Sequence, residues 1–175
     1  GLSVGGMLAP YIYNLDKNKI NKMVVMDSYV GEEPIETKEL YFSMLDGIEK
    51  IKCIPDTLIE KIAPMFFSPS IDKSGILYKS FVEKLKTIQG EKVEGIVKLG
   101  KAIFGRENAL NLLSDIEVPT YFVVGEYDIP RPYNESVEMA TYMKKSKVLK
   151  IKNAGHISNL ENVEEASRIL VDILK

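Results

Sequence analysis

The stretch Gly1-Leu2-Ser3-Val4-Gly5-Gly6 decides the fold, because it carries the pattern Gly-x-Ser-x-Gly. In this pattern a serine lies on a sharp turn between a strand and a helix, and small neighbours let the backbone adopt a strained conformation. Gly1 and Gly5 have no Cβ that could clash at such a turn. The sequence therefore predicts a nucleophile elbow that presents the hydroxyl of Ser3.

An elbow of this kind normally follows a strand inside a parallel sheet, and no residue precedes Gly1 to form that strand. We therefore expect the chain to be the C-terminal part of a longer protein, with its N-terminal strands missing. Residues 22–27 would then form a bare edge, which a second copy, another segment of the same polypeptide or a separate N-terminal part would complete. The 175 residues alone are expected to have little or no activity.

A serine nucleophile needs a general base, and the base needs a carboxylate that orients it. The only histidine, His156, lies in a loop between the apolar run 148–151 and a helical C-terminal segment. Asp128 follows the β-branched and aromatic run 120–124, which predicts a buried strand. In a parallel sheet both loops reach the same edge, so Ser3, Asp128 and His156 are predicted to form a catalytic triad.

Three motifs together resemble the α/β-hydrolases of the small, cofactor-free type: the turn at Ser3, the Gly-x-x-Asp loop 125–128, and Asn-Ala-Gly-His-x-x-Asn-Leu-Glu at 153–161. The chain is similar to 3-oxoadipate enol-lactonases, carboxylesterases and meta-cleavage-product hydrolases over residues 1–30 and 115–175. The order serine, acid, histidine is that of the family. The resemblance implies an α/β fold of parallel strands with flanking helices, of which this chain is the C-terminal portion.

Three other carboxylates compete with Asp128 for the role of the acid. Asp115 precedes the predicted strand and so lies at the wrong edge, while Glu126 would point in a different direction. Asp27, after the strand-like residues 23–26, occupies a position from which some relatives supply their acid. It is the second choice.

The resemblance also implies where charge is stabilised during the reaction. The N–H of Val4, directly after the nucleophile, would be one oxyanion donor. The second donor comes, in relatives, from a loop that this chain lacks. Val163 stands where many relatives have proline, which we interpret as neutral for the chemistry.

The pattern predicts three regions, with hydrolase core at 1–35 and 115–175 and a helical cap or lid at 36–114. The core is expected to begin with a helix at 4–16, interrupted by Pro10. Strands are expected at 22–27, 120–124 and 147–151, and further helices at 133–144 and 162–174. An insertion in this fold implies a lid over the active site. Met65, Phe66 and Phe67 are candidate substrate-binding residues, with helix packing as the alternative for each.

Composition excludes several classes of protein. With 45% apolar and 27% charged residues the chain is typical of a globular protein, and its net charge of −2, without basic blocks joined to aromatic residues, predicts no nucleic-acid partner. No apolar run approaches about 18 residues, so no membrane span is predicted. A single cysteine, Cys53, excludes an internal disulfide and fits the cytoplasm. One histidine and one cysteine predict no metal site, and no nucleotide fingerprint follows a strand, so no cofactor is expected.

These features predict a serine hydrolase that acts through an acyl-enzyme on a small carboxylic ester, lactone or related acyl substrate. A serine at the elbow argues against the dehalogenases and epoxide hydrolases of the same fold, which use a carboxylate there. Two other interpretations stay open: a hydrolase-like module that binds a small ligand, and a folded remnant without activity.

Overall fold

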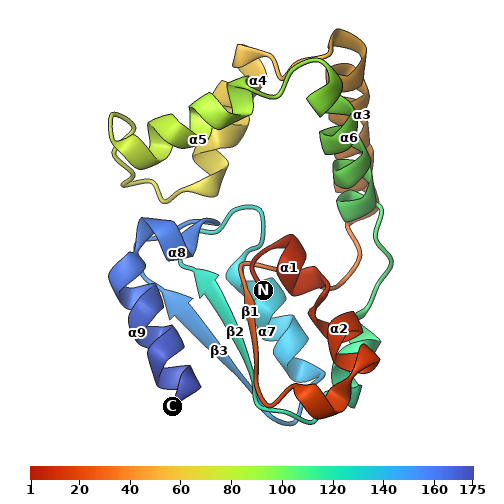
Figure 1. Cartoon of the computed structure of the whole chain (residues 1–175), viewed down its shortest axis with the longest axis vertical. Coiled ribbons are helices and arrows are strands. Elements are labelled where there is room, and N and C mark those ends of the chain that lie inside the picture. Colours follow the sequence, from red (N-terminus) through yellow and green to blue (C-terminus); the bar gives the residue numbers. More distant parts are fainter. The chain divides into compact units, whose positions relative to one another are not determined.

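The computed structural model describes all 175 residues, which divide into two compact units (Figure 1). The first unit consists of Gly1–Val30, Pro64–Ile71 and Ala109–Lys175, and the second of Gly31–Ala63 and Asp72–Asn108. The sequence placed residues 64–71 inside the helical insertion. In the structure this segment instead packs with the first unit.

Three parallel strands form the sheet of the first unit, in the order β1-β2-β3. They are β1 (Met23–Met26), β2 (Thr120–Gly125) and β3 (Ser146–Ile151), close to the predicted 22–27, 120–124 and 147–151. Met23 pairs with Thr120, and Thr120 pairs with Ser146. The predicted α/β arrangement with parallel strands is therefore confirmed, and all three carboxyl ends lie at one edge of the sheet.

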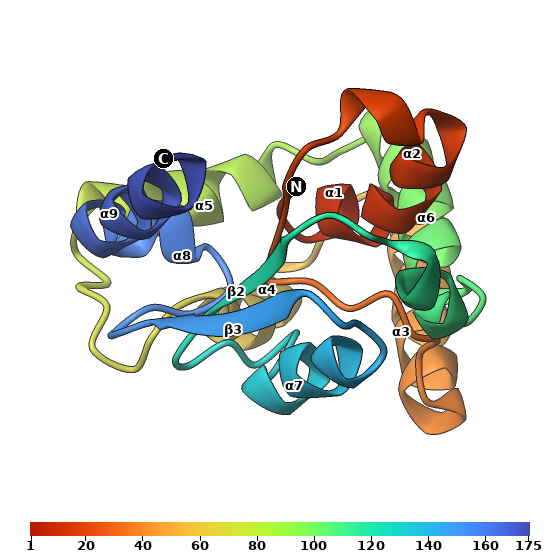
Figure 2. The ribbon, with the colours of Figure 1, turned by 90° about the horizontal axis from the view of Figure 1, so that it is seen from below.

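The central strand β2 is buried on both faces, which explains its continuous apolar character. Side chains of a strand alternate between the faces. Phe122 therefore packs in one core with Tyr13 and Met139, while its neighbour Val123 packs in a second core with Ala166. Figure 2 shows α7 (Tyr133–Thr141) and α9 (Val163–Leu174) on opposite sides of the sheet.

The helix predicted over residues 4–16 is divided in the structure. α1 (Val4–Met7) ends at Leu8, and α2 (Ala9–Leu15) begins next to it with Pro10 in its first turn. Proline has no N–H to donate and is tolerated in a first turn, so the break falls where the sequence predicts an interruption. The chain has four other short elements: η1 (Lys17–Lys19), η2 (Ala63–Phe66), η3 (Leu110–Asp115) and α8 (Ser158–Glu161).

Four helices make up the second unit: α3 (Ile35–Ile51), α4 (Asp56–Ile62), α5 (Ile76–Lys86) and α6 (Glu91–Phe104). α6 buries Val93, Val97 and Gly100, which lie on one face because they are spaced by four and three residues. A Cβ on Gly100 would lie 2.9 Å from both methyl groups of Leu45, so α3 and α6 approach closely here. No helix of the chain is both long and apolar enough to cross a membrane.

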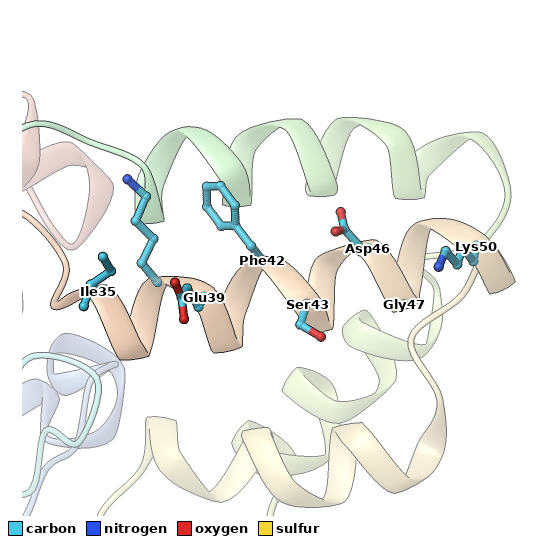
Figure 3. A pocket seen from close by; sticks show the side chains of 8 residues that line it. Ile35, Glu39, Phe42, Ser43, Asp46, Gly47 and Lys50 are labelled. Carbon is cyan, nitrogen blue, oxygen red and sulfur yellow. The ribbon is translucent and has the colours of Figure 1, made fainter.

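An open hollow of about 740 Å³ lies along α3 in the second unit (Figure 3). Phe42 and Ser43 point to opposite sides of the helix, so the lining side chains do not converge on one point. The residues that line the hollow all belong to this helix: Ile35, Lys38, Glu39, Phe42, Ser43, Asp46, Gly47 and Lys50. A binding site needs convergent polar groups, and we assign no function to this hollow.

Candidate active site

Ser3 adopts the strained backbone conformation that an elbow requires, with φ 50° and ψ −116°. Hydrogen bonds hold the turn on both sides. The Ser3 N–H donates to Met26 O (2.9 Å), and the Met26 N–H donates to Gly1 O (2.8 Å). The hydroxyl of the buried Ser28 donates to Ser3 O (2.7 Å). Such strain persists only where the surroundings hold it, and here β1 and Ser28 supply that support.

Of the two glycines that the pattern singles out around Ser3, only one is in a tight position. A Cβ on Gly1 would lie 2.3 Å from Gly5 O, so Gly1 is required, as predicted. A Cβ on Gly5 would have no atom within 4 Å, so the role predicted for Gly5 is wrong. Gly6 is the second tight position, because its Cβ would lie 2.6 Å from Cβ and Oγ of Ser28.

Alanine substitutions at these two adjacent glycines are expected to differ in effect. Gly6→Ala forces Ser28 away from the Ser3 carbonyl, and overpacking of this kind costs about 1–3 kcal/mol of unfolding free energy. Gly5→Ala is the matched control and should leave stability unchanged or slightly increased, since alanine favours a helix. Urea unfolding of both variants measures the difference. Equal destabilisation by the two substitutions would contradict this assignment.

His156 joins Ser3 and Asp128 in one hydrogen-bonded line. Its Nε2 lies 3.0 Å from Ser3 Oγ, and its Nδ1 lies 3.1 and 3.0 Å from the two carboxylate oxygens of Asp128. His156 and Asp128 are 6% and 5% exposed, so both are shielded from water. An imidazole held in this way donates from Nδ1 to the carboxylate and offers Nε2 as the acceptor for the serine proton.

The loops that carry Asp128 and His156 pack directly against each other through their backbones. A Cβ on Gly125 would lie 2.0 Å from Gly155 O, so only glycine allows β2 to approach the histidine loop this closely. Tyr127 N–H donates to Ala154 O across the two loops (2.8 Å). Within its own loop, Asp128 accepts from Arg131 N–H (2.8 Å). The backbone therefore fixes Asp128 relative to His156.

The rival carboxylates Asp115 and Glu126 do not reach the imidazole. Glu126 accepts from Asn153 N–H (3.0 Å), which ties the start of the acid loop to the start of the histidine loop. Asp115 lies at the exposed end of η3, before β2 begins, at the opposite edge of the sheet. The carboxylate that contacts His156 is that of Asp128.

Asp27, the second choice for the acid, makes a different set of contacts. It is fully buried at the end of β1, where its carboxylate accepts from Gly125 N–H (2.8 Å) and from the Ser158 hydroxyl (2.5 Å). Burial raises the pKa of Asp27 to about 7, although these two hydrogen bonds oppose the rise. Asp27 thus links the ends of β1 and β2 to α8 and does not orient the imidazole.

The raised pKa of Asp27 predicts how stability depends on pH. Between about pH 4 and pH 7 the folded protein keeps the proton of Asp27 while the unfolded chain loses it. The unfolding free energy should therefore fall as pH rises through this window, by up to about 1.4 kcal/mol per pH unit from this group. Asp27→Asn, which mimics the protonated side chain, should flatten the slope in urea unfolding. Parallel slopes for both proteins would contradict the prediction.

The remaining predicted site residues lie at or near this group. The Val4 N–H, at the start of α1, donates to no acceptor of the chain. The Phe66 ring stands edge-on to the imidazole of His156, with 5.4 Å between ring centroids. Met65 is half-buried, whereas Phe67 is 1% exposed and has no surface that a substrate could contact in this structure.

Sequence reasoning missed two buried serines near these side chains: Ser28, which donates to Ser3 O, and Ser158, which donates to Asp27. Serine is common on protein surfaces, and nothing in its local sequence marks a buried hydrogen-bond donor. The structure brings together no group of three or more His, Cys, Asp or Glu side chains that could hold a metal ion.

The sequence matches no family model and no curated protein, but solved structures match nearly all of it. A thermophilic esterase from Thermogutta terrifontis is 22% identical, with a TM-score of 0.81, and the match covers 99% of this chain and 62% of that one. An enol-lactonase from Burkholderia xenovorans is 18% identical, with a TM-score of 0.82, and the match covers 99% of this chain and 64% of that one. An α/β-hydrolase enzyme from a Medee basin deep-sea metagenome library is 17% identical, with a TM-score of 0.82, and the match covers 99% of this chain and 63% of that one.

The chain therefore has the α/β-hydrolase fold, as the sequence predicts, and corresponds to the C-terminal portion of that fold. It spans between 62% and 64% of the length of the three solved chains. At these identities the likeness establishes the fold, and what the chain does must be argued from its own site.

Proposed function

We propose that the protein is a serine hydrolase in which Ser3 is the nucleophile, His156 the general base and Asp128 the orienting acid. The observation that carries the proposal is the line of hydrogen bonds from Ser3 Oγ through the imidazole to the Asp128 carboxylate. The strained backbone at Ser3 supports it, because strain of this kind is concentrated at functional sites.

The proposed reaction is acyl transfer in two halves. Ser3 Oγ attacks the substrate carbonyl carbon while His156 Nε2 takes the serine proton, and the imidazolium then gives this proton to the departing alcohol. Water, deprotonated by His156, attacks the acyl-enzyme and releases the acid together with free Ser3. The unpartnered Val4 N–H is proposed as one donor to the oxyanion in both halves.

The proposed substrate is a small carboxylic ester or lactone. The half-buried Met65 and Phe66 supply apolar surface, and the Phe66 ring adjoins the base, which favours an apolar substituent next to the reacting carbonyl. The names of the matching structures, an esterase and an enol-lactonase, agree with this class. A lid role for the helices of the second unit and a cytoplasmic location remain predictions from the sequence.

Hydrolysis of p-nitrophenyl acetate, p-nitrophenyl hexanoate and a simple γ-lactone by the full-length protein that carries these residues tests the proposal. We expect turnover of at least one of the three, because a hydroxyl whose proton a positioned base can accept attacks an ester carbonyl. Tight binding of an ester without turnover would favour the ligand-binding alternative instead. If the protein neither binds nor hydrolyses any of the three compounds, that result contradicts the proposed class.

Completion of the sheet at β1 also stays a proposal. The edge of β1 away from β2 pairs with Leu2 at Met26, and the Gly1 amino group donates to Val24 O (2.8 Å). We propose that a further strand, from a second copy or from an N-terminal part, extends the sheet beyond these short contacts. Full turnover by a monodisperse monomer of these 175 residues would contradict it.

A further inference from the structure

Glu161 joins two segments of the first unit that are far apart in the sequence, and we call its hydrogen bonds to Ser68 and Gly155 the clasp. Its carboxylate accepts from Ser68 N–H (2.9 and 3.1 Å) and from the Ser68 hydroxyl (2.5 Å) on one side, and from Gly155 N–H (2.8 Å) on the other. Gly155 directly precedes His156. Ser68 is 2% exposed and belongs to Pro64–Ile71, so one carboxylate holds this segment and the histidine loop together.

The same two segments touch at three further places. Ile157 N–H donates to Phe66 O (3.2 Å), and a Cβ on Gly155 would lie 2.5 Å from the carbonyl carbon of Phe67. The third place is the edge-on contact between the Phe66 ring and the imidazole of His156. The backbone of the segment is therefore fixed against the histidine loop, and the position of the Phe66 ring depends on that attachment.

The interactions of Glu161 are of the strong kind. Hydrogen bonds to an ionised carboxylate are shorter and stronger than those between neutral groups. Here one carboxylate receives two backbone donors and one hydroxyl, and Ser68 is shielded from water. Removal of one partner would leave buried polar groups unsatisfied, which costs more than the bond itself contributes.

We propose that Glu161 is a positioning residue for substrate selection: by binding Ser68 and Gly155 at once, it fixes the Phe66 ring next to His156 as one wall of the substrate site. This inference rests on the proposed function and deepens it. The ring bounds the space in which an apolar substituent of the ester lies, whereas Ser3, His156 and Asp128 act on the carbonyl. Loosening the clasp on the Ser68 side should therefore change substrate preference more than the chemical step.

Ser68→Ala tests the proposal, because it removes the hydroxyl bond to Glu161 and leaves the bond between Glu161 and Gly155 in place. Ser70→Ala is the matched control, since the exposed Ser70 hydroxyl contacts the Ser68 hydroxyl and not Glu161. Glu161→Ala removes both sides of the clasp, and Glu164→Gln is the control for charge. All variants are made in the full-length protein.

Two measurements are needed. The first is amide hydrogen exchange of a peptide that covers residues 64–71, which should rise by about tenfold in Ser68→Ala and Glu161→Ala and not in the controls. The second is the kinetics of p-nitrophenyl hexanoate and acetate. In Ser68→Ala the KM for the hexanoate should rise about tenfold while kcat for the acetate stays within about twofold.

The outcomes separate this inference from the proposed function. Unchanged exchange in Ser68→Ala and Glu161→Ala, or equal changes for both esters in Ser68→Ala, would overturn the role of Glu161 even if the wild-type protein is active. Increased exchange in a protein that hydrolyses no ester would contradict the proposed function and the selection role with it, while confirming the clasp. If substrate preference changes in Ser68→Ala, and hydrogen exchange increases in Ser68→Ala and Glu161→Ala but not in the controls, the result supports both the proposed function and the role of Glu161.

Discussion

His156→Ala is expected to lower kcat for ester hydrolysis by about 10⁴-fold or more, because the proposed triad would act as a unit and lose its function with any member. Asp128→Asn should come close to this effect, since an amide no longer favours the tautomer in which Nδ1 carries the proton. The measurement is single-turnover kinetics with p-nitrophenyl acetate, together with thermal unfolding to verify that each variant is folded.

Two matched controls accompany these variants. Glu126→Gln changes the neighbouring carboxylate, which contacts Asn153 rather than the imidazole, and should cost less than about tenfold in kcat. Asp27→Asn changes the second choice for the acid and should likewise keep most of the activity. An active Asp128→Asn together with an inactive Asp27→Asn would transfer the role of the acid to Asp27.

Gly125→Ala is expected to be the most destabilising single methyl addition in the first unit. Its Cβ would lie 2.0 Å from Gly155 O and 2.7 Å from Ala154 O, and both atoms belong to the backbone of the histidine loop. Since backbone cannot yield as a flexible side chain does, we expect a loss of about 3 kcal/mol or more in unfolding free energy.

Gly47→Ala is the matched control for this prediction. Gly47 lies on the exposed face of α3, and a Cβ there would have no atom within 4 Å. Replacement of glycine by alanine inside a helix stabilises by about 0.5–1 kcal/mol. Urea unfolding should therefore move in opposite directions for the two variants. A loss below about 1 kcal/mol in Gly125→Ala would show that the two loops are not packed as described.

Much of the first unit could be predicted from local sequence. The strands are short apolar runs bounded by turn residues, and parallel pairing brings their carboxyl ends together, so Asp128 and His156 could be placed beside Ser3. Pro10 marked the break between α1 and α2 for a purely local reason.

What the sequence could not provide depends on tertiary contacts. Residues 64–71 carry no local sign that they leave the helices around them, because Glu161, far along the chain, holds them in the first unit. The pattern around Ser3 singled out Gly5, but a side chain at Gly5 would meet no other atom. The residue without room for a Cβ is Gly6, because Ser28 lies next to it. Nor does the sequence indicate that Asp27 is buried, which decides its pKa.

The central claim is that His156 and Asp128 make Ser3 a nucleophile, and reaction with a fluorophosphonate measures this most directly. A hydroxyl activated by a base reacts with such a reagent, and an ordinary serine does not. Intact mass and peptide mapping of the full-length protein should place one adduct on Ser3, and Ser3→Ala and His156→Ala should remain unlabelled. Labelling that persists in Ser3→Ala, or a wild-type protein that stays unlabelled, would contradict the claim.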